Sequence, residues 1–414
     1  MSKTDLAQGV MERIDVLAQI SEEPDRLTRP FGSLAMRRAN HLIGGWMREA
    51  GMSVSEDAIG NLTGRYSGRN DHGKTFLLGS HLDTFRPVGK FDGALGVLAA
   101  IACVQELHES QTLLPFAVEV ISFAGEEEVR YPNACLGSRV VAGTFDLKEL
   151  DQVDAKGISM ADAIRNFGGD PAKVKSARRD PREFLGYAEV HIEQGPVLER
   201  KFQPVGLVSA IAGLTRISAR FTGQTGHAGA TPMAFRRDAL AAAAQFMAAV
   251  EATARNENGL VATVGRIEAR PGASNIIPGE ATLTLEVRHQ LDSTRTSAAA
   301  RLQELAQQIC EKRSIGLDWE VTREAQSVPC SRELSSLLGK AARRHLVEVT
   351  ELPSGAEHSA AIMGEIMPVV MLFVRSHQPD ESATTEDIGV AITVMNDFLQ
   401  LLAGQNTPAK ARQK

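Results

Sequence analysis

Residues 75–84 have the sequence TFLLGSHLDT, in which a short apolar run ends in a polar cluster. Residues 116–128, FAVEVISFAGEEE, repeat that arrangement further along the chain. The segment at residues 94–108 is rich in Ala, Leu and Val and predicts a helix between the two. Buried strands that alternate with helices are typical of a parallel or mixed sheet covered by helices. Ligands of such sheets bind outside the carboxyl ends of the strands, which is where both polar clusters fall.

The C-terminal part of the chain has the same alternating character. After Pro329, residues 331–345 predict a helix, and residues 368–374, PVVMLFV, predict a buried strand. A last helix is expected over residues 385–403, with Thr385 as its N-cap, because acidic residues follow in the first turn.

The middle of the chain has a different pattern. Residues 208–222, 259–269 and 281–289 alternate apolar and polar side chains, as half-exposed antiparallel strands do. Two long helices are expected among them, at residues 234–255 and 293–312. Together these elements predict a separate α+β unit.

The simplest organisation is one discontinuous domain that is interrupted by an inserted one. We expect an α/β fold whose mixed-sheet domain is formed by residues 1–209 and 328–414, with residues 210–327 as the inserted α+β domain. A chain of 414 residues is long enough for two such domains.

The composition excludes several classes of protein. The chain is 43% hydrophobic and 23% charged, as ordinary globular proteins are. Its net charge is −6 and it has no basic stripe, so no nucleic-acid partner is expected. No apolar stretch reaches the ~20 residues that cross a bilayer, so no membrane partner is expected either. The first residues do not form a signal peptide, which predicts a cytoplasmic protein.

The cysteines support that location. The chain has four, Cys103, Cys135, Cys310 and Cys330, and they form no CxxC pair. We expect reduced thiols without disulfides, as in a cytoplasmic protein. A zinc cluster or a nucleophilic thiol are the less favoured alternatives.

Metal-ligating and acid–base residues gather at the predicted strand ends. They are His81 and Asp83 in SHLDT, Asp92 in KFDGALG, Glu126, Glu127 and Glu128 in AGEEEVR, His191, Glu193 and Gln194 in HIEQG, and His377 and Glu381 in SHQPDE. A hydrolytic two-metal site needs imidazoles, terminal carboxylates and one carboxylate that bridges both ions. A further carboxylate must take a proton from water and pass it to the leaving nitrogen.

Each of these segments alone also has a purely structural explanation. A lone HxD at a strand end can be a capped turn, and HIEQG can be an ordinary strand exit. Three successive glutamates can be a solvated helix start, where negative charge suits the helix dipole. Three histidines that lie beside carboxylates at the ends of buried strands favour the metal site jointly.

Nine segments then carry a specific resemblance. In order, they are SHLDT, FDGALG, EE, HIEQGPVLE, GHAGATPM, RRDAL, NIIPG, EVRH and PSGAEH. The chain resembles the hydantoinase/carbamoylase branch of the aminoacylase and carboxypeptidase-like zinc metallopeptidases over residues 29–402. That branch includes N-carbamoyl-L-amino-acid hydrolases, allantoate amidohydrolases and β-ureidopropionases.

The resemblance implies two divalent metal ions per subunit, of Zn or of Mn, Co or Ni. His81 and His191 would bind one ion. Glu127 and His377 would bind the other, and Asp92 would bridge both.

It also implies the acid–base and second-layer roles. Glu126 would be the general base that activates water, and Asp83 would orient the ring of His81. His227 would come from the inserted domain, often across a dimer interface, and stabilise the oxyanion. The inserted domain would accordingly serve as a lid and dimerisation domain in a homodimer.

Other residues would hold a small ureido-substituted substrate that carries a carboxylate. They are Gln194, Arg216, Asn275, Arg288, Gly355 and His358. Arg288 suits a bidentate clamp on the carboxylate. Without the resemblance, Arg288 could equally be a solvated strand residue, His227 an exposed loop residue and Asn275 a turn residue.

The sequence departs from the family pattern in three places. Gly125 stands where Asp usually precedes the glutamate pair, and Glu357 and Ser359 replace Gly and Asp of the SGAGHDA motif. Relatives carry a longer connection before the last ligand histidine, whereas here only two residues separate Val374 from His377. The shorter connection reshapes one wall of the expected pocket.

We expect an enzyme that cleaves carbon–nitrogen bonds in linear amides. The expected reaction is hydrolysis of an N-carbamoyl-L-amino acid to the L-amino acid, CO2 and NH3. Allantoate amidohydrolase and β-ureidopropionase are the alternatives within the branch, and a dipeptidase or aminoacylase is the alternative in the wider clan. A protein that binds ureido compounds on a decayed scaffold is the non-enzyme alternative.

Overall fold

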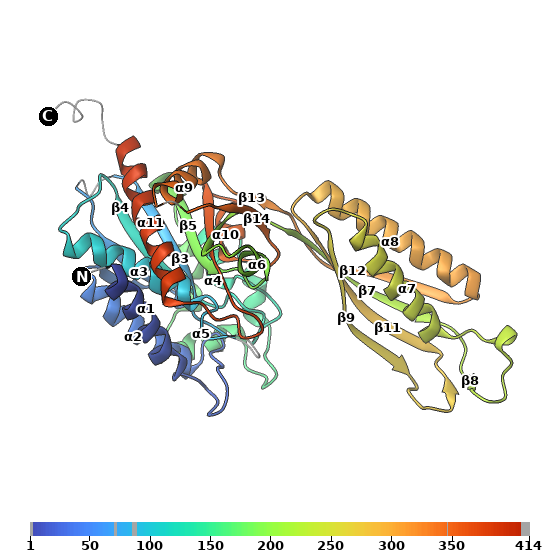
Figure 1. Ribbon diagram of the computed structural model, residues 1–414. Coiled ribbons are helices and arrows are strands. Elements are labelled where there is room, and N and C mark those ends of the chain that lie inside the picture. The colour runs from blue at the N-terminus through green and yellow to red at the C-terminus, as the bar shows by residue number, and fades with distance from the viewer. Residues whose placement is uncertain (1–2, 70–72, 85–88, 346, 407–414) are drawn as a thin grey trace. The chain divides into compact units, whose positions relative to one another are not determined.

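The computed structural model describes residues 3–69, 73–84, 89–345 and 347–406. The chain divides into two compact units (Figure 1). The large unit comprises Met1–Ser209, Cys330–Leu352 and Glu357–Lys414, and the small unit comprises Ala210–Pro329 and Pro353–Ala356.

A mixed sheet forms the centre of the large unit. Over the described residues it has nine strands in the order β1-β2-β4-β3-β5-β15-β6-β13, with β14 beside β6. The strands are β1 (Ser53–Glu56), β2 (Leu62–Tyr66), β3 (Thr75–His81), β4 (Ala117–Phe123), β5 (Phe184–Ile192), β6 (Val205–Ile211), β13 (Val328–Pro329), β14 (Thr350–Ser354) and β15 (Val369–Val374). The central strands β4, β3, β5 and β15 are parallel, and β2 and β6 run antiparallel to them. The expected α/β class is confirmed.

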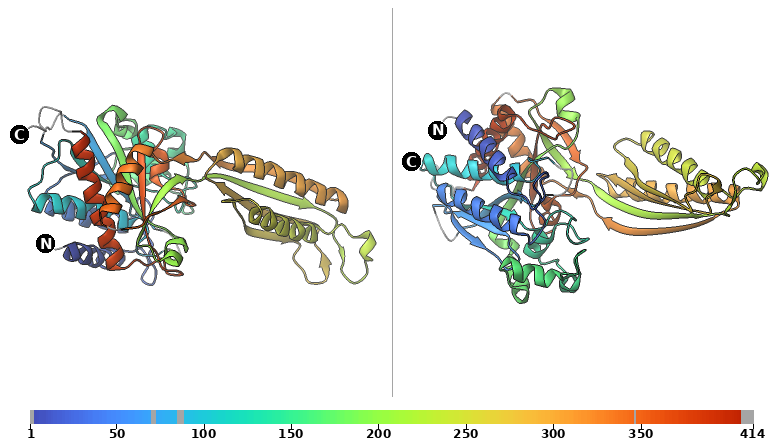
Figure 2. Two further views of the ribbon diagram at one scale, coloured as in Figure 1. Left: turned by 45° about the horizontal axis from the view of Figure 1, so that its top comes forward. Right: turned by 90° about the horizontal axis from the view of Figure 1, so that it is seen from below.

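Helices cover both faces of this sheet (Figure 2). They are α1 (Lys3–Ala18), α2 (Leu34–Glu49), α3 (Ala94–Glu109), α4 (Leu136–Ala142), α5 (Met160–Phe167), α6 (Val197–Lys201), α9 (Arg332–Arg344), α10 (Ser359–Met363) and α11 (Thr385–Gln405). Helices α1, α3 and α11 pack together, whereas α4 and α10 pack against each other and on β4, β5 and β15. Every residue of β3 and β4 is buried, because both faces are covered.

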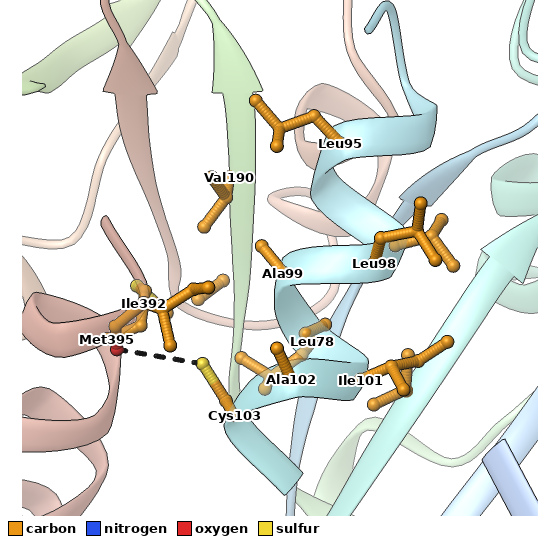
Figure 3. Close-up of a cluster of buried hydrophobic side chains, with 14 of the residues drawn as sticks. Leu78, Leu95, Leu98, Ala99, Ile101, Ala102, Cys103, Val190, Ile392 and Met395 are labelled. Carbon is orange, nitrogen blue, oxygen red and sulfur yellow. Dashed lines mark hydrogen bonds between the residues drawn. The ribbon is translucent and has the colours of Figure 1, made fainter. Parts of the chain in front are cut away.

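Helix α3 forms the middle of the main hydrophobic core. Figure 3 shows Leu95 and Ala99 of this helix among side chains from β5 and α11, with Val190 and Ile392 labelled. The dashed line joins Cys103 Sγ to the backbone oxygen of Ile392, 3.9 Å away. Small side chains on α3 allow its close approach to its neighbours, as the Ala-rich sequence predicts.

Helix α11 departs from two expectations. It is apolar and long enough to cross a membrane by length and composition, although no such stretch was expected, but most of it is buried in the large unit. Its N-cap is Thr384 and not Thr385, because the Thr384 hydroxyl accepts the backbone N–H of Asp387 at 3.1 Å. That N-cap-to-N3 spacing leaves Thr385 inside the first turn.

The small unit is an α+β unit. A four-stranded antiparallel sheet has the order β12-β7-β11-β9, from β7 (Gly213–Thr222), β9 (Val261–Arg270), β11 (Glu280–His289) and β12 (Gly316–Ala325). Helices α7 (Ala239–Arg255) and α8 (Asp292–Arg313) pack on it, and β8 (Gly226–His227) pairs with β10 (Ile276–Ile277). Every second side chain of β11 is buried against the helices, which explains the alternating sequence.

Three details of this unit differ from the prediction. The strand expected over residues 208–222 is two strands, β6 and β7, and they are separated at Ala212, whose N–H donates to Ser354 O at 2.9 Å. Helix α7 begins five residues later than expected, at Ala239, because Asp238 caps it. Strand β12 was not predicted.

Candidate metal centre

Four strand ends converge at one edge of the large sheet. Strands β4, β3, β5 and β15 are parallel neighbours, so their carboxyl ends lie together. His81 ends β3, Glu126 and Glu127 follow β4, and His191 lies one residue before the end of β5. Of these side chains only that of Glu127 is more than slightly exposed.

One group of side chains fits a metal ion closely. Ligand atoms of His81, Asp92 and His191 all lie within 4.8 Å of one another. His191 Nε2 lies 3.3 Å from Asp92 Oδ1, but these two atoms do not form a hydrogen bond. Among the described residues, neither His191 Nε2 nor Asp92 Oδ2 has a hydrogen-bond partner, although both are buried. Buried polar atoms are rarely left without partners, and a divalent cation would satisfy both.

The other ring nitrogens set the orientation of the two imidazoles. His81 Nδ1 lies 3.0 Å from the backbone oxygen of Asp83, and His191 Nδ1 lies 3.0 Å from that of Ile192. A carbonyl oxygen can only accept, so each Nδ1 carries a proton, and in the neutral ring Nε2 is then the nitrogen with the lone pair. This is the protonation state that a metal-binding histidine requires.

A second group consists of His81, Glu126 and Glu127, whose ligand atoms also lie within 4.8 Å of one another. Burial, together with Asp83 and Asp92, raises the pKa of Glu127 to about 9. Burial and the neighbouring carboxylates, Glu127 first among them, raise the pKa of Glu126 well above its usual value. Buried carboxylates that face one another lack a compensating positive charge, which a divalent ion would supply.

Asp83 connects the two halves of this site. Its carboxylate accepts the backbone N–H of Glu126 at 3.0 Å and that of Glu127 at 2.9 Å. Its own backbone oxygen, and not its carboxylate, is the closer partner of His81 Nδ1, since Oδ1 is 3.7 Å away. Asp83 thus fixes the backbone of the glutamate pair as well as the ring of His81.

Gly93 explains part of the FDGALG motif. Its φ is +62°, and a Cβ at this position would lie 2.5 Å from ring atoms of His81. A larger residue would therefore clash with the imidazole and also strain the backbone. Glycine allows Asp92 and the start of α3 to lie directly beside β3.

Two residues expected to line the pocket lie beside the first group. Gln194 Nε2 donates to Asp92 Oδ1 at 3.3 Å. The buried ring of His358 has its centroid 4.5 Å from that of His191. Gly355 belongs to the small unit, where its backbone oxygen accepts Arg288 Nη1 at 2.7 Å.

His377 lies in a different environment. Its Nδ1 is 2.8 Å from Glu199 Oε1, and its side chain is 36% exposed. It belongs to neither group of potential ligands that the described part of the chain contains.

Two of the residues expected to grip substrate lie together in the small unit. Arg216 Nε is 3.1 Å from Glu286 Oε2, and Arg288 Nε is 2.7 Å from Glu286 Oε1. Strands β7 and β11 bring the three residues together, with Arg216 directly opposite Glu286. Glu286 thereby holds both guanidinium groups in place.

His227 and Asn275 form a separate pair. The backbone oxygen of Asn275 accepts the N–H of Ala228 at 2.9 Å, next to the pairing of β8 with β10. His227 Nδ1 accepts the N–H groups of Gly229 and Ala230, each at 3.1 Å. A neutral ring with an unprotonated Nδ1 carries its proton on Nε2, so His227 presents an N–H donor.

The small unit does not bring these two pairs together. Arg216 lies near the start of β7, whereas His227 follows its far end at Thr222. Thr222 is six residues beyond Arg216 on β7. At about 3.3 Å per residue of strand, the two pairs therefore lie roughly 20 Å apart.

Two further residues of the centre were not assigned a role from sequence. Glu189 is buried on β5 and accepts Ser80 Oγ at 2.8 Å and Tyr187 Oη at 3.0 Å. It precedes His191 by two residues, and that spacing, which places both on one face of a strand, was an available signal. Glu381 follows β15 and interacts electrostatically with Asp92 and His191; the SHQPDE segment singled it out as a strand-end residue but gave it no role.

Comparisons with known proteins show the family to which the chain belongs. Residues 77–401 match Peptidase family M20/M25/M40. The N-carbamoyl-L-amino acid amidohydrolase of Geobacillus stearothermophilus is 38% identical, over 96% of this chain and 98% of its own length. The allantoate deiminase of Arabidopsis thaliana is 37% identical, over 96% and 84%. The crystal structure of a hydantoinase/carbamoylase family amidase from Burkholderia ambifaria has a TM-score of 0.89 and 30% identity, over 96% of this chain and 98% of that one.

Proposed function

The chain belongs to peptidase family M20/M25/M40, in its hydantoinase/carbamoylase branch of carbon–nitrogen hydrolases, and from this we propose that it hydrolyses N-carbamoyl-L-amino acids. The products are the L-amino acid, CO2 and NH3. The relatives divide between carbamoyl amino acids and allantoate, so the family alone does not select the substrate.

The observation that carries the proposal is the pair of unpartnered atoms at the strand ends. Asp92 Oδ2 and His191 Nε2 are buried, face the same space and have no partner among the described residues. We propose that His81 and His191 would hold one divalent ion, that Glu127 would help to hold a second, and that Asp92 would be a ligand shared by both. When bound, the ions lower the pKa of water and polarise the carbonyl group of the substrate.

Glu126 is the proposed general base. Its carboxylate lies beside the first ligand, with Oε2 at 3.9 Å from His81 Nε2. It takes a proton from water as the water oxygen bonds to the carbamoyl carbon. It then gives that proton to the leaving nitrogen as the carbon–nitrogen bond breaks.

The small unit supplies the proposed substrate contacts. The guanidinium groups of Arg216 and Arg288 both donate to Glu286. A substrate carboxylate would replace some of these hydrogen bonds with its own. His227 presents its Nε2–H as a donor for the oxyanion. Because His227 and the arginines lie roughly 20 Å apart, we propose that they serve two different active sites of a homodimer.

Allantoate is the second candidate substrate, because the plant relative that shares 37% identity is an allantoate deiminase. Allantoate and N-carbamoyl amino acids both carry a ureido group and a carboxylate, so the same contacts would hold either. N-carbamoyl-β-alanine shares these groups and belongs in the same test. The unpaired cysteines support a reducing, cytoplasmic location.

The test is ammonia release by metal-stripped protein that is resupplied in turn with Zn²⁺, Mn²⁺, Co²⁺ and Ni²⁺. The substrates are N-carbamoyl-L-amino acids, N-carbamoyl-β-alanine, allantoate and dipeptides, and Glu126→Gln is the control. Metal-dependent release from carbamoyl amino acids, lost in Glu126→Gln, supports the proposal. Release from allantoate alone selects the second candidate, and substrate binding without turnover under any metal indicates a binding protein.

A further inference from the structure

The start of α4 forms a backbone clamp on the turn that carries Glu126. Three consecutive N–H groups before and within the helix donate to three consecutive carbonyl oxygens of that turn. The pairs are Cys135 to Glu126 at 2.8 Å, Leu136 to Gly125 at 2.8 Å and Gly137 to Ala124 at 2.7 Å. The position of Glu126 therefore depends on the start of α4 as well as on Asp83, which accepts its N–H.

Gly137 allows this close approach. A Cβ at position 137 would lie 2.2 Å from Asn61 Oδ1 and 2.5 Å from the backbone nitrogen of Ala124. Asn61 supports the same clamp, since its Oδ1 accepts the N–H of Ala124 at 2.8 Å and its Nδ2 donates to Gly137 O at 3.2 Å. The clamp is thus closely packed and requires a residue without a side chain at this position.

Cys135 contacts Glu126 a second time, through its side chain. Its Sγ lies 3.8 Å from Oε1 of that carboxylate, and both residues are buried. A carboxylate can only accept, so the thiol donates. Burial, and then the charge of Glu126, raises the pKa of Cys135 well above its usual value, so the sulfur keeps the proton that it donates. The other carboxylate oxygen, Oε2, lies on the side of the candidate metal centre, 3.9 Å from His81 Nε2.

The backbone of Cys135 is unusual for a residue with a side chain. Its φ of 56° and ψ of 36° lie in the left-handed region, which glycine adopts more readily. The side chain of Cys135 makes no capping hydrogen bond to α4, so capping does not explain its presence. Backbone conformations of this kind persist where the surrounding structure enforces them, and they are concentrated at functional sites. The contact with Glu126 is what a cysteine provides here and a glycine would not.

We propose that Cys135 is a positioning residue for the general base, an inference that rests on the proposed function of Glu126. Its N–H fixes the backbone of Glu126, and its thiol holds Oε1. Oε2 is then the atom that takes the proton from water and passes it to the leaving nitrogen. A carboxylate that is held at both ends adopts fewer unproductive orientations, and small displacements of reacting groups slow a reaction strongly.

The first experiment measures kcat and KM of the metal-loaded full chain, with the ureido compound that the wild type hydrolyses fastest. Cys135→Ala and Cys135→Gly remove the thiol but keep the backbone N–H, and glycine also accepts the left-handed φ. Both should lower kcat by ~10-fold and leave KM and the number of bound ions unchanged, because substrate contacts and metal ligands are intact. Cys135→Ser, whose hydroxyl also donates, should restore kcat to within ~3-fold of the wild type.

Cys103→Ala is the matched control. The thiol of Cys103 is also buried and donates over a similar distance, 3.9 Å, to the backbone oxygen of Ile392 in the main core (Figure 3). This variant should lose stability, because it leaves a cavity as Cys135→Ala does, but it should keep the wild-type kcat. A kcat that falls equally in both variants indicates a general packing effect and overturns the inference.

An infrared measurement tests the contact without metal or substrate. The S–H stretching band of Cys135 is the one that disappears from the spectrum of the metal-stripped chain in Cys135→Ala. It should move to higher frequency in Glu126→Ala, because the thiol loses its acceptor. The band of Cys103, identified in the same way, should stay in place.

Three results overturn the inference: a wild-type kcat in Cys135→Ala, a serine variant as slow as the alanine variant, or an S–H band that Glu126→Ala does not move. Loss of a bound ion from Cys135→Ala also contradicts it, because the residue would then support the metal centre and not the base. A wild type that hydrolyses no ureido compound overturns the proposed function instead, whatever the position of the S–H band.

Discussion

The carboxylate of Asp83 accepts the backbone N–H of Glu127 at 2.9 Å. The two residues follow neighbouring parallel strands, β3 and β4, so this bond ties one strand end to the other. Because Asp83 also contacts the ring of His81 through its backbone oxygen, one residue positions groups on both sides of the centre. Under the proposed function, Asp83 would therefore act on catalysis through these neighbours.

Replacing Asp83 with Asn should weaken metal binding by ~10–100-fold, the usual effect of losing a contact behind a metal ligand. The amide can accept one backbone N–H but presents its NH2 group to the other. Calorimetric titration of the metal-stripped variant measures the loss. Asp146→Asn, which changes an exposed helix cap, is the control, and equal affinities in the two variants would argue against the positioning role.

Mixing two inactive variants tests whether His227 acts across a dimer. A dimer in which both subunits carry Glu126→Gln has two damaged sites, and so has a dimer in which both subunits carry His227→Ala. If His227 serves the partner's site, mixed dimers contain one intact site, and an equal mixture regains roughly a quarter of wild-type activity. If His227 serves its own subunit, no mixed dimer has an intact site and the mixture stays inactive. Refolding or coexpression forms the mixed dimers, and sedimentation verifies their assembly.

Without metal, stability should fall as pH rises, and bound metal should remove most of this dependence. Burial and nearby carboxylates raise the pKa of Glu127 from 4.5 to about 9 in the metal-free chain. Between these values the folded chain binds more protons than the unfolded one, so its free energy of unfolding falls as pH rises. Ions that replace those protons bind better at high pH.

Thermal unfolding with EDTA or with saturating metal, from about pH 5 to pH 9, measures this dependence. The gap between the two melting temperatures should widen as pH rises. Glu127→Gln should flatten the metal-free curve, and a gap that stays constant over the range contradicts the prediction.

The native protein should be unreactive toward thiol reagents at pH 8. All four cysteines are buried, and burial raises the pKa of Cys310 and of Cys330 to about 11. Burial also raises the pKa of Cys103 and Cys135. The thiolate is the reactive form, so little of it is present. An aromatic disulfide reagent should detect four thiols only after denaturation, and rapid reaction of a native thiol contradicts this.

Much of the candidate centre could be predicted because its signals are local. His81, Glu126 and His191 each lie within three residues of the end of a buried strand. An apolar run followed by a polar cluster predicts such an end, and parallel strands bring their ends together. The orientation of each ring could not be predicted, because it depends on backbone carbonyls such as that of Asp83.

Other features depend on contacts between distant segments. The break between β6 and β7 is not visible in the alternating sequence, because it involves Ser354 from a later strand. Strand β12 is an edge strand, and none of its residues is fully buried. Its sequence does alternate, with Leu317, Trp319 and Val321 between polar residues, so this strand could have been predicted from the local pattern.

The sequence by itself determined the family, the α/β class and most of the side chains at the strand ends, because hydrophobic periodicity and short motifs are properties of neighbouring residues. Only the tertiary structure decided which of the two side chains in the last loop faces the centre. In this loop, Glu381 accepts a hydrogen bond from Gln194, which also donates to Asp92, whereas His377 pairs with Glu199. That choice depends on backbone conformation and on packing against Gly89, which lies far from Glu381 in the sequence and next to it in the fold.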